Sequence, residues 1–472
     1  MVQSIGVRLL DSAGLFQQLG DTVVLEALTT MVAPEQIAAA LEATGRRERR
    51  RRRLPAAAVV WLVIGMGIWS TVNIPTIWRR LRGTLRETFR ALAGGREPAK
   101  SAFSAARKRL GAAPLRQVFR QTVRPPAGSE TAGASYRGMR MRVIDGVHLN
   151  VPDTPQNGAA FGRPGTTRHG QAVAGAYPQV LVVYLQEAGT HAIQEALLRR
   201  ANGSEHSAVG PLLRQVPAGD LLLCDRGFYS HALLAQAVEQ RVRVLCRVPS
   251  YVGLRPVRRQ ADGSYLAQVR PTWRQGKAEH PVIVRVLEYT LDDPTRPGYG
   301  ERHRLATTLL DVEHYPAREL ICLYHERWEI EIANDEWKTH QLGRPVSLRS
   351  LTPAGVIQEV YGLLVAYNAV RGLMHEAALA ENLDPRRLSF VHALRVIRDG
   401  IADMRNARTE QLPVLYRGLL KQIGQGRLPP RENRINPRVV KRTQSKFPKK
   451  RPEHYRSPPP ITLFSEAVVM LN

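Results

Sequence analysis

Residues 220 to 230, DLLLCDRGFYS, contain the pattern that decides the fold: four apolar residues lie between two aspartates, and a glycine-containing turn follows. A short apolar run bounded by turn residues is typical of a strand buried on both faces of a sheet. The next segment, HALLAQAVEQR (231–241), has apolar residues at helical spacing, and VRVLCRV (242–248) is again a strand. This strand–helix–strand unit predicts an α/β domain with a partly parallel sheet.

Further strands lie on both sides of this unit. MRVIDGVHLNV (141–151) and YPQVLVVYLQE (177–187) precede it, and both have the composition of buried strands. Between about 249 and 311 the apolar period is strand-like, and turns rather than helices separate the runs. We therefore expect an antiparallel β insertion over 249–311, within an α/β domain that spans residues 136–385.

Helical periodicity characterises both ends of the chain. Residues 1–124 predict an all-α N-terminal domain, and the basic residues of 101–123 suit contact with a phosphate backbone, although basic helical hairpins are common. We expect this domain to bind DNA. Residues 125–135, PPAGSETAGAS, have the composition of a linker. Residues 386–472 predict a helical C-terminal region with a basic tail that contains several prolines.

One long apolar segment allows two interpretations. Residues 54 to 72, LPAAAVVWLVIGMGIWSTV, are nearly uncharged and follow seven arginines between Arg46 and Arg53. Length and flanking charge fit a membrane-spanning helix with its basic end inside. Gly65, Gly67 and the polar end of the segment, with no second segment of this kind in the sequence, favour a helix buried in the all-α domain. We expect the buried helix and no membrane partner.

The charge of the chain indicates a polyanionic partner. Its 472 residues include 68 Lys and Arg against 41 Asp and Glu, for a net charge of +27 and a pI near 10.8. Nucleic acid is the expected partner, because arginine binds phosphate in a bidentate way, although GC-rich coding also enriches arginine. Three cysteines without a CxxC pair, and the lack of HExxH, argue against a disulfide framework or a zinc site. With no secretory signal visible, we expect a cytoplasmic protein.

Two aspartates are candidates for chemistry because they follow apolar strands. Asp145 comes after Val143-Ile144 and before Gly146, and Asp225 comes after the run LLLC. A carboxylate at a strand end lies on a rigid element and reaches the edge of the sheet, where α/β proteins build their sites. An Asp in this position is also a common turn former or helix cap, so each residue alone is weak evidence.

A third acid comes from YHERWEIEIANDEWK, residues 324–338. On a continuous helix with about 100° per residue, four polar residues fall within an arc of about 60°. These four are Tyr324, Arg327, Glu331 and Lys338. An apolar stripe holds Leu323, Ile330, Ala333 and Trp337, and the predicted solvent side holds His325, Glu329 and Glu336. Asp335 lies nearest to the arc and is the alternative to Glu331 as the third acid.

The spacing Y-x2-R-x3-E-x6-K resembles the signature of transposases of the insertion element 4 group. It is matched by Tyr324, Arg327, Glu331 and Lys338. VIDGVHLNVPDTPQN (143–157) and LLLCDRGFYS (221–230) resemble the segments with the first two catalytic acids of that group. Similarity also extends to LPAAAVVWLVIGMGIW (54–69) and RKRLGAAPLRQVF (107–119), and it covers most of residues 10–450.

The resemblance implies a ribonuclease-H-like core, with the β insertion before the last catalytic helix, and cut-and-paste DNA transposition. The catalytic acids would be Asp145, Asp225 and Glu331. Oxygen ligands suit Mg²⁺ or Mn²⁺, so we expect these acids to bind two such ions. The expected DNA contacts are Tyr324, Arg327, Lys338, Arg226 and Arg142. The expected partners are the terminal inverted repeats of the element, the target DNA and a second copy of the chain in the DNA complex.

Two alternatives use the same residues differently. A ribonuclease-H-like nuclease or resolvase shares the three acids but cuts DNA without joining it. The basic N-terminal domain and the Tyr/Arg/Lys arc favour transposition over this alternative. The three matched acids argue against a non-catalytic basic protein that binds DNA or membranes, because such a protein does not need them. An inactive remnant of a transposase would still contain them.

Overall fold

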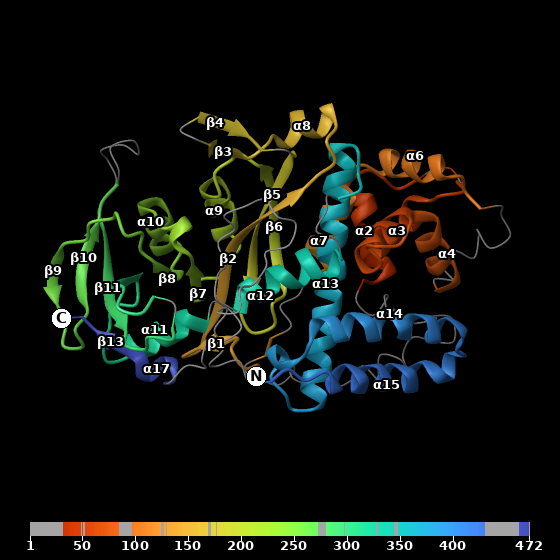
Figure 1. Cartoon of the computed structure of the whole chain (residues 1–472). Coiled ribbons are helices and arrows are strands. Elements are labelled where there is room, and N and C mark those ends of the chain that lie inside the picture. Colours follow the sequence, from red (N-terminus) through yellow and green to blue (C-terminus); the bar gives the residue numbers. More distant parts are fainter. Residues whose placement is uncertain are drawn as a thin grey trace. The chain divides into compact units, whose positions relative to one another are not determined.

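The computed structural model describes most of the chain between residues 32 and 471. The described residues are 32–48, 50, 52–84, 97–123, 127–128, 130–168, 171–175, 177–271, 280–296, 298–326, 329–343, 348–429 and 462–471. The chain divides into two compact units (Figure 1). Unit 1 contains Met1–Ala134, Gly146–Gly203 and Ile330–Leu428. Unit 2 contains Ser135–Asp145, Ser204–Glu329 and Pro429–Asn472.

Unit 2 is built on a mixed sheet with the strand order β2-β7-β8-β12-β11-β10-β9. The strands are β2 (Met139–Asn150), β7 (Leu221–Cys224), β8 (Arg243–Arg247), β9 (Pro256–Arg259), β10 (Tyr265–Val269), β11 (Val282–Leu291) and β12 (His303–Thr307). β2, β7 and β8 are parallel, and the pairs from β8 to β9 are antiparallel. Two short strands, β1 (Ser135–Tyr136) and β13 (Val468–Met470), pair with β2 and β11. The partly parallel sheet and the antiparallel β insertion are therefore confirmed.

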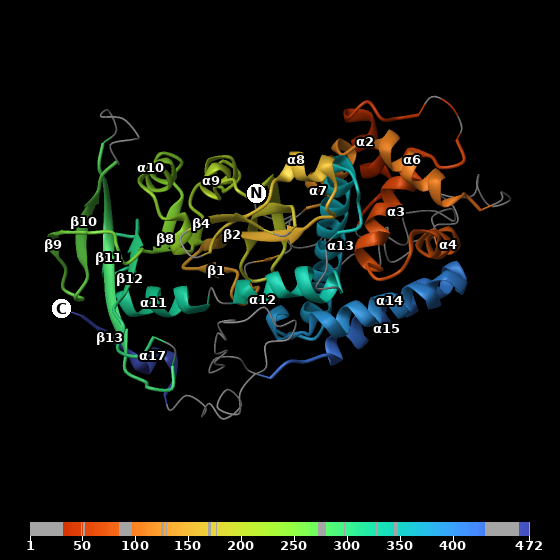
Figure 2. The same ribbon diagram turned by 45° about the horizontal axis from the view of Figure 1, so that its top comes forward.

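Helices cover both faces of this sheet. They are α9 (His206–Leu213), α10 (His231–Glu239), α11 (Ala317–His325) and the short α17 (Phe464–Ala467). α10 packs on β8 and β11, and α11 packs on β8 from the opposite side (Figure 2). β7 is fully buried, as its uninterrupted apolar run predicts, because helices cover it on both sides.

Unit 1 contains the other part of the α/β architecture. β5 (Gln179–Glu187) and β6 (Ile193–Arg200) form an antiparallel pair, and β5 is followed in the sheet by β2, whose residues from Gly146 belong to this unit. Eight of the nine residues of β5 are buried, because its run of Val, Leu and Tyr faces apolar neighbours on both sides. The small elements α8 (Pro155–Phe161), β3 (Gly165–Arg168) and β4 (Gln171–Ala174) also belong to this unit.

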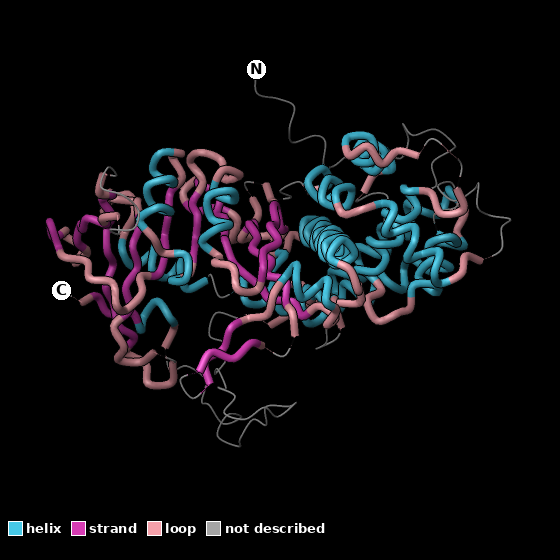
Figure 3. The backbone as a smooth tube through the Cα atoms, turned by 90° about the horizontal axis from the view of Figure 1, so that it is seen from above, coloured by secondary structure: helices cyan, strands magenta, loops and turns pink. Residues whose placement is uncertain are grey.

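The helix α13 (Pro353–Ala380) is the centre of unit 1. Thr352 caps its first turn by accepting a hydrogen bond from the backbone N–H of Gly355, and Pro353 occupies the first helical position. Figure 3 looks nearly along α13 and shows other helices of the unit grouped around it. These are α2 (Pro34–Ala43), α3 (Ala56–Ile68), α4 (Ile74–Thr84), α6 (Lys100–Leu110), α7 (Ala113–Thr122), α14 (Phe390–Asn406) and α15 (Leu412–Gln425). In the described part of the N-terminal region, between residues 32 and 123, every regular element is a helix, which confirms the all-α prediction there.

The long apolar segment forms α3, which is buried along nearly its whole length. It packs against α13 at a close approach: a Cβ atom at Gly67 would lie 2.8 Å from the carbonyl oxygen of Gly362. Among the described residues, no helix has the length and hydrophobicity that crossing a bilayer requires. The predicted buried helix is confirmed, and its two glycines are explained by contacts with other helices, Gly65 with α4 and Gly67 with α13.

We predict that Gly362→Ala destabilises unit 1 by about 1–3 kcal/mol, because the new methyl group would overpack this contact. A Cβ at Gly362 would lie 2.7 Å from both the backbone oxygen and a methyl carbon of Val63. Gly418→Ala on α15 is the matched control, because a Cβ there has no neighbour within 4 Å. The control should keep or slightly raise the free energy of unfolding measured in urea. Equal effects of the two substitutions would contradict the packing explanation.

Candidate active site

Asp145 and Asp225 lie side by side because of the register of β2 and β7. These parallel strands pair up to Ile144 and Cys224, and an aspartate follows each of these two residues in the chain. Neighbouring strands lie about 4.8 Å apart, so the two aspartates lie next to each other, directly after the last paired residues of β2 and β7. Both residues are half-buried, and Asp225 Oδ1 accepts a hydrogen bond of 2.8 Å from the backbone N–H of Arg226.

The position of Asp145 corrects one expectation. Asp145 does not end its strand, since β2 continues to Asn150. The neighbouring strand β7 is shorter and ends at Cys224. The pairing of β2 with β7 therefore stops at Ile144, directly before Asp145. The carboxylate therefore lies on a continuous strand, where it is held more rigidly than at a strand end.

A third carboxylate, Glu205, lies close to this pair and was not found from the sequence. Glu205 precedes the first residue of α9, and one of its carboxylate oxygens lies 3.7 Å from the place of a Cβ at Gly227. Its pKa is raised, first by partial burial and then by the negative charges of Asp145 and Asp225. The two aspartates are thus close enough to Glu205 within unit 2 for their charges to act on its carboxylate. The only signal in the sequence was an acid directly before a helix, a common capping position.

The predicted DNA-binding residues of unit 2 differ in exposure. Arg226 is exposed and follows Asp225 directly. Tyr324 is buried on α11, and its hydroxyl group donates a hydrogen bond of 3.2 Å to the carbonyl oxygen of Cys224. Arg142 is buried on β2 and forms an ion pair of 2.9 Å with Asp220. Contact of Arg142 with DNA would require that pair to open.

The stretch 324–338 is not one continuous helix, which corrects the helical projection. α11 ends at His325, α12 (Glu329–Asp335) follows, and residues Glu336–Gln341 form a π-helix. A break and a wider turn both change the angle between residues, so a uniform 100° step does not apply. Arg327 lies outside the described residues, and so does the side chain of Glu331, whose backbone belongs to α12.

Two residues predicted on the solvent side of this stretch are in fact shielded. His325 stacks on Phe464 with a ring distance of 3.5 Å, and burial lowers its pKa to about 4. Glu336 is buried in unit 1. The predicted burial of Ala333 and Trp337 is confirmed, whereas Leu323 is only half-buried.

Buried polar contacts hold α12 and the π-helix within unit 1. The Tyr184 hydroxyl on β5 donates to Asn334, and the Tyr184 ring packs edge-to-face against Trp337 at 6.0 Å. Glu336 accepts a hydrogen bond of 3.0 Å from the Tyr367 hydroxyl and lies 3.5 Å from the guanidinium of Arg371. The segment that carries Glu331 is therefore fixed to both the sheet and α13.

The charges around Glu336 fix its protonation state. Burial acts to raise the pKa of Glu336, but Arg371 and His191 outweigh it and hold this pKa below its ordinary value. Burial and the charge of Arg371 lower the pKa of His191 to about 4. At neutral pH Glu336 is therefore ionised and His191 is neutral, and the guanidinium group of Arg371 lies beside Glu336.

The remaining predicted residues of this segment are exposed. Lys338 is exposed on the π-helix, and its charge adds to burial in lowering the pKa of His148. Asp335 is also exposed and lies 3.0 Å from the imidazole of His340. The structure thus brings Asp145, Asp225 and Glu205 together, whereas the approach of Glu331 to them stays a prediction.

The donor atoms of this site suit a hard divalent cation. All its acids offer carboxylate oxygens, which Mg²⁺ and Mn²⁺ prefer, and the mutual repulsion at Glu205 is relieved by a positive ion. Among the described side chains, which include Asp145, Asp225 and Glu205, no group of three Asp, Glu, His or Cys residues is placed to hold a metal ion. Glu331, the expected third ligand, is not one of those side chains.

Comparison with known proteins decides the family. Residues 22–120 match the family "Insertion element 4 transposase N-terminal", and residues 136–369 match the family "Transposase DDE domain". The chain is 32% identical to "Transposase InsG for insertion sequence element IS4" of Escherichia coli K12 over 434 residues, 90% of this chain and 93% of the relative. The chain belongs to the insertion element 4 family of DDE transposases.

A second relative of this transposase is the "Putative transposase InsZ" of Escherichia coli K12. It is 31% identical over 185 residues, 39% of this chain and 58% of the relative. Membership of the family confirms the ribonuclease-H-like fold of the α/β core. It also makes the chain an enzyme that acts on DNA and depends on divalent metal ions.

Proposed function

We propose that this transposase binds the terminal inverted repeats of its insertion sequence, cuts the DNA at their ends and joins the freed ends to a target. The observation that supports this most strongly is the register that sets Asp145 beside Asp225, within an enzyme of the DDE family. We propose Glu331 as the third acid. Asp335 is the weaker candidate because its carboxylate lies at the surface with His340.

Asp145, Asp225 and Glu331 would together hold the divalent metal ions, which we propose to be two Mg²⁺ or Mn²⁺. Bound ions of this kind activate the attacking oxygen and stabilise the leaving 3′ oxygen in a phosphodiester displacement. The attacking group would be water in the first cut and the new 3′-OH in the joining step. The carboxylate of Glu205 would add negative charge beside the first two ligands and strengthen cation binding there.

The basic residues around these acids would position the DNA end. We propose that Arg226 and Lys338, both exposed, bind phosphates near the cleaved bond, together with Arg327. Tyr324 would not contact DNA directly but would position Asp225, because its hydroxyl group donates a hydrogen bond to the carbonyl oxygen of Cys224. We propose Arg142 as a DNA contact only when it leaves Asp220.

The other parts of the chain would bring the ends together. We propose residues 1–124 as the DNA-binding domain, 125–135 as a linker, 136–385 as the catalytic domain and 386–472 as a helical region with a basic tail. Two ends must be joined in one event, so we propose a homodimer in the DNA complex. A protein with a net charge of +27 would associate with the nucleoid of a bacterial cell.

The test is a reaction of the purified protein with a supercoiled plasmid that carries two terminal repeats. With Mg²⁺ we expect cuts at the repeat ends and strand-transfer products, and with EDTA we expect neither. A plasmid with scrambled repeats is the matched control. Cutting without joined products would indicate the nuclease alternative, and equal cutting of both plasmids would contradict recognition of the repeats.

A further inference from the structure

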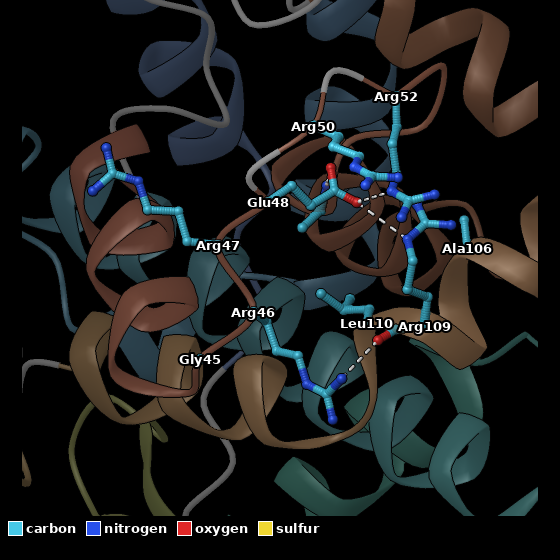
Figure 4. A pocket seen from close by; sticks show the side chains of 10 residues that line it. Gly45, Arg46, Arg47, Glu48, Arg50, Arg52, Ala106, Arg109 and Leu110 are labelled. Carbon is cyan, nitrogen blue, oxygen red and sulfur yellow. Dashed lines mark hydrogen bonds and ion pairs between the residues drawn. The ribbon is translucent and has the colours of Figure 1, made fainter.

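A pocket of about 320 Å³ in unit 1 lies beside the first turn of α3 and is rich in arginine. Figure 4 shows its lining side chains. The charged ones are Arg46, Arg47, Arg50, Arg52, Arg109 and Glu48. Five positive charges against one negative charge give the lining a net positive charge, but Arg47 pairs with Glu42 at the surface and does not contribute to the cluster at Glu48.

Glu48 organises the pocket. One of its carboxylate oxygens lies 3.1 Å from Nε of Arg109 and 3.5 Å from Nε of Arg52. The other oxygen accepts a hydrogen bond of 3.2 Å from the backbone N–H of Ala56, the first residue of α3. One carboxylate therefore ties the arginine-rich loop to both α3 and α6, and both of its oxygens take part in these contacts.

Backbone carbonyl groups fix two of the arginines. Arg109 donates to the carbonyl oxygen of Leu54 at 2.7 Å, and Arg46 donates to the carbonyl oxygen of Arg109 at 3.2 Å. Their guanidinium groups are held in place before any ligand binds, which reduces the entropy lost on binding.

In Figure 4 the guanidinium groups of Arg50, Arg52 and Arg109 gather around the single carboxylate of Glu48. Like charges repel at this spacing, and a second anion would relieve the repulsion. Guanidinium groups offer only donors, in a planar fork that matches phosphate oxygens. Arg50 and Arg52 are exposed, so a ligand as large as duplex DNA reaches them.

We infer that this pocket binds one backbone phosphate of duplex DNA, without reading the base sequence. The inference rests on the proposed function, because it assigns a phosphate contact to the DNA-binding domain. The acceptor must carry negative charge, which a base edge lacks. A phosphate contact positions the duplex and contributes equally to every sequence.

The test measures DNA binding of the full-length protein by fluorescence anisotropy over a salt series. One duplex carries the terminal repeat and the other an unrelated sequence of equal length. Arg50→Gln/Arg52→Gln should weaken binding to both duplexes by about the same factor, roughly tenfold, and reduce the salt slope by about one. Unchanged thermal unfolding of the variant checks that the loop still folds.

Arg47→Gln is the matched control, because it removes a charge from the same loop but not from the cluster. Arg47 points away from the other arginines in Figure 4 and pairs with Glu42 at 3.4 Å on the surface. The salt dependence of DNA binding should have the same slope for Arg47→Gln as for the wild type. An equal loss of slope in the control would overturn the inference in favour of diffuse charge, and a loss confined to the repeat duplex would overturn it in favour of base recognition.

A methylphosphonate scan of the repeat duplex locates the phosphate. One neutral linkage should weaken binding to the wild type but leave binding to Arg50→Gln/Arg52→Gln unchanged; equal losses in both proteins at every linkage would overturn the inference. The proposed function fails separately, when the wild type binds both duplexes equally and does not cut at the repeats. The slope comparison still decides on the pocket in that case.

Discussion

Replacing Asp145 or Asp225 with Asn should lower the rate of DNA cleavage by a factor of at least about 10³, which corresponds to about 4 kcal/mol of activation free energy. The amide is nearly isosteric but lacks the charge that two adjacent carboxylates supply to a metal ion. In Asp225→Asn the amide oxygen can still accept the hydrogen bond from the Arg226 N–H, so this variant should fold normally. The measurement is cutting of the repeat-bearing plasmid, with anisotropy to show that DNA binding persists.

The third acid is tested in the same assay by a matched pair of substitutions. Glu331→Gln should lose cleavage to the same extent, whereas Asp335→Asn should stay within about twofold of the wild type, because Asp335 is exposed and pairs with His340. Full activity of Glu331→Gln together with loss in Asp335→Asn would show that the third acid was chosen wrongly. Cleavage by Asp145→Asn at the wild-type rate would contradict the site itself.

Asp145 and Asp225 could be predicted because the residues next to them in the sequence mark them as candidates. An apolar run followed by an acid marks Asp225 and Asp145 in the sequence, and the parallel pairing of β2 with β7 then brings them together. The sequence does not contain the register itself, which follows from the packing of the whole sheet. The strand predicted over 141–151 already contained Asp145, but only the register shows that its pairing with β7 stops just before that residue.

Glu205 and the π-helix were missed for a different physical reason. Glu205 meets Asp145 and Asp225 only through tertiary contacts, and its sequence neighbours are those of an ordinary helix start. A projection at a uniform angle cannot show the break after His325 or the wider turn from Glu336. That turn places Glu336 in the core, where a charged residue is stable only because Arg371 lies beside it.

Arg371→Met should therefore lower the free energy of unfolding by about 3–5 kcal/mol, because it leaves Glu336 buried without its cation. Both side chains are almost completely buried, and burial still opposes a charge on the neighbouring His191 when Arg371 is removed. Urea unfolding at pH 7.5 measures the loss. Arg417→Met, which removes an exposed arginine from α15, should change stability by less than about 0.5 kcal/mol.

The effect of Arg371→Met should also depend on pH in a definite direction. In the wild type the pKa of Glu336 is lowered, so its stabilising contribution is present above the unfolded pKa and is lost as pH falls through the folded pKa. Without Arg371 burial dominates and raises this pKa, so protonation in acid relieves the buried charge. The difference between variant and wild type should then shrink from pH 7.5 to pH 5.5.

A double variant separates loss of the ion pair from loss of packing. Arg371→Met/Glu336→Gln removes both charges, and it should be more stable than Arg371→Met alone, because the amide can still accept the Tyr367 hydrogen bond. Since the π-helix follows the segment that carries Glu331, we expect Arg371→Met to cleave DNA more slowly, and the double variant to regain part of that activity. A single variant as stable as the wild type, or a double variant with additive losses, would show that the Glu336–Arg371 pair does not hold this segment.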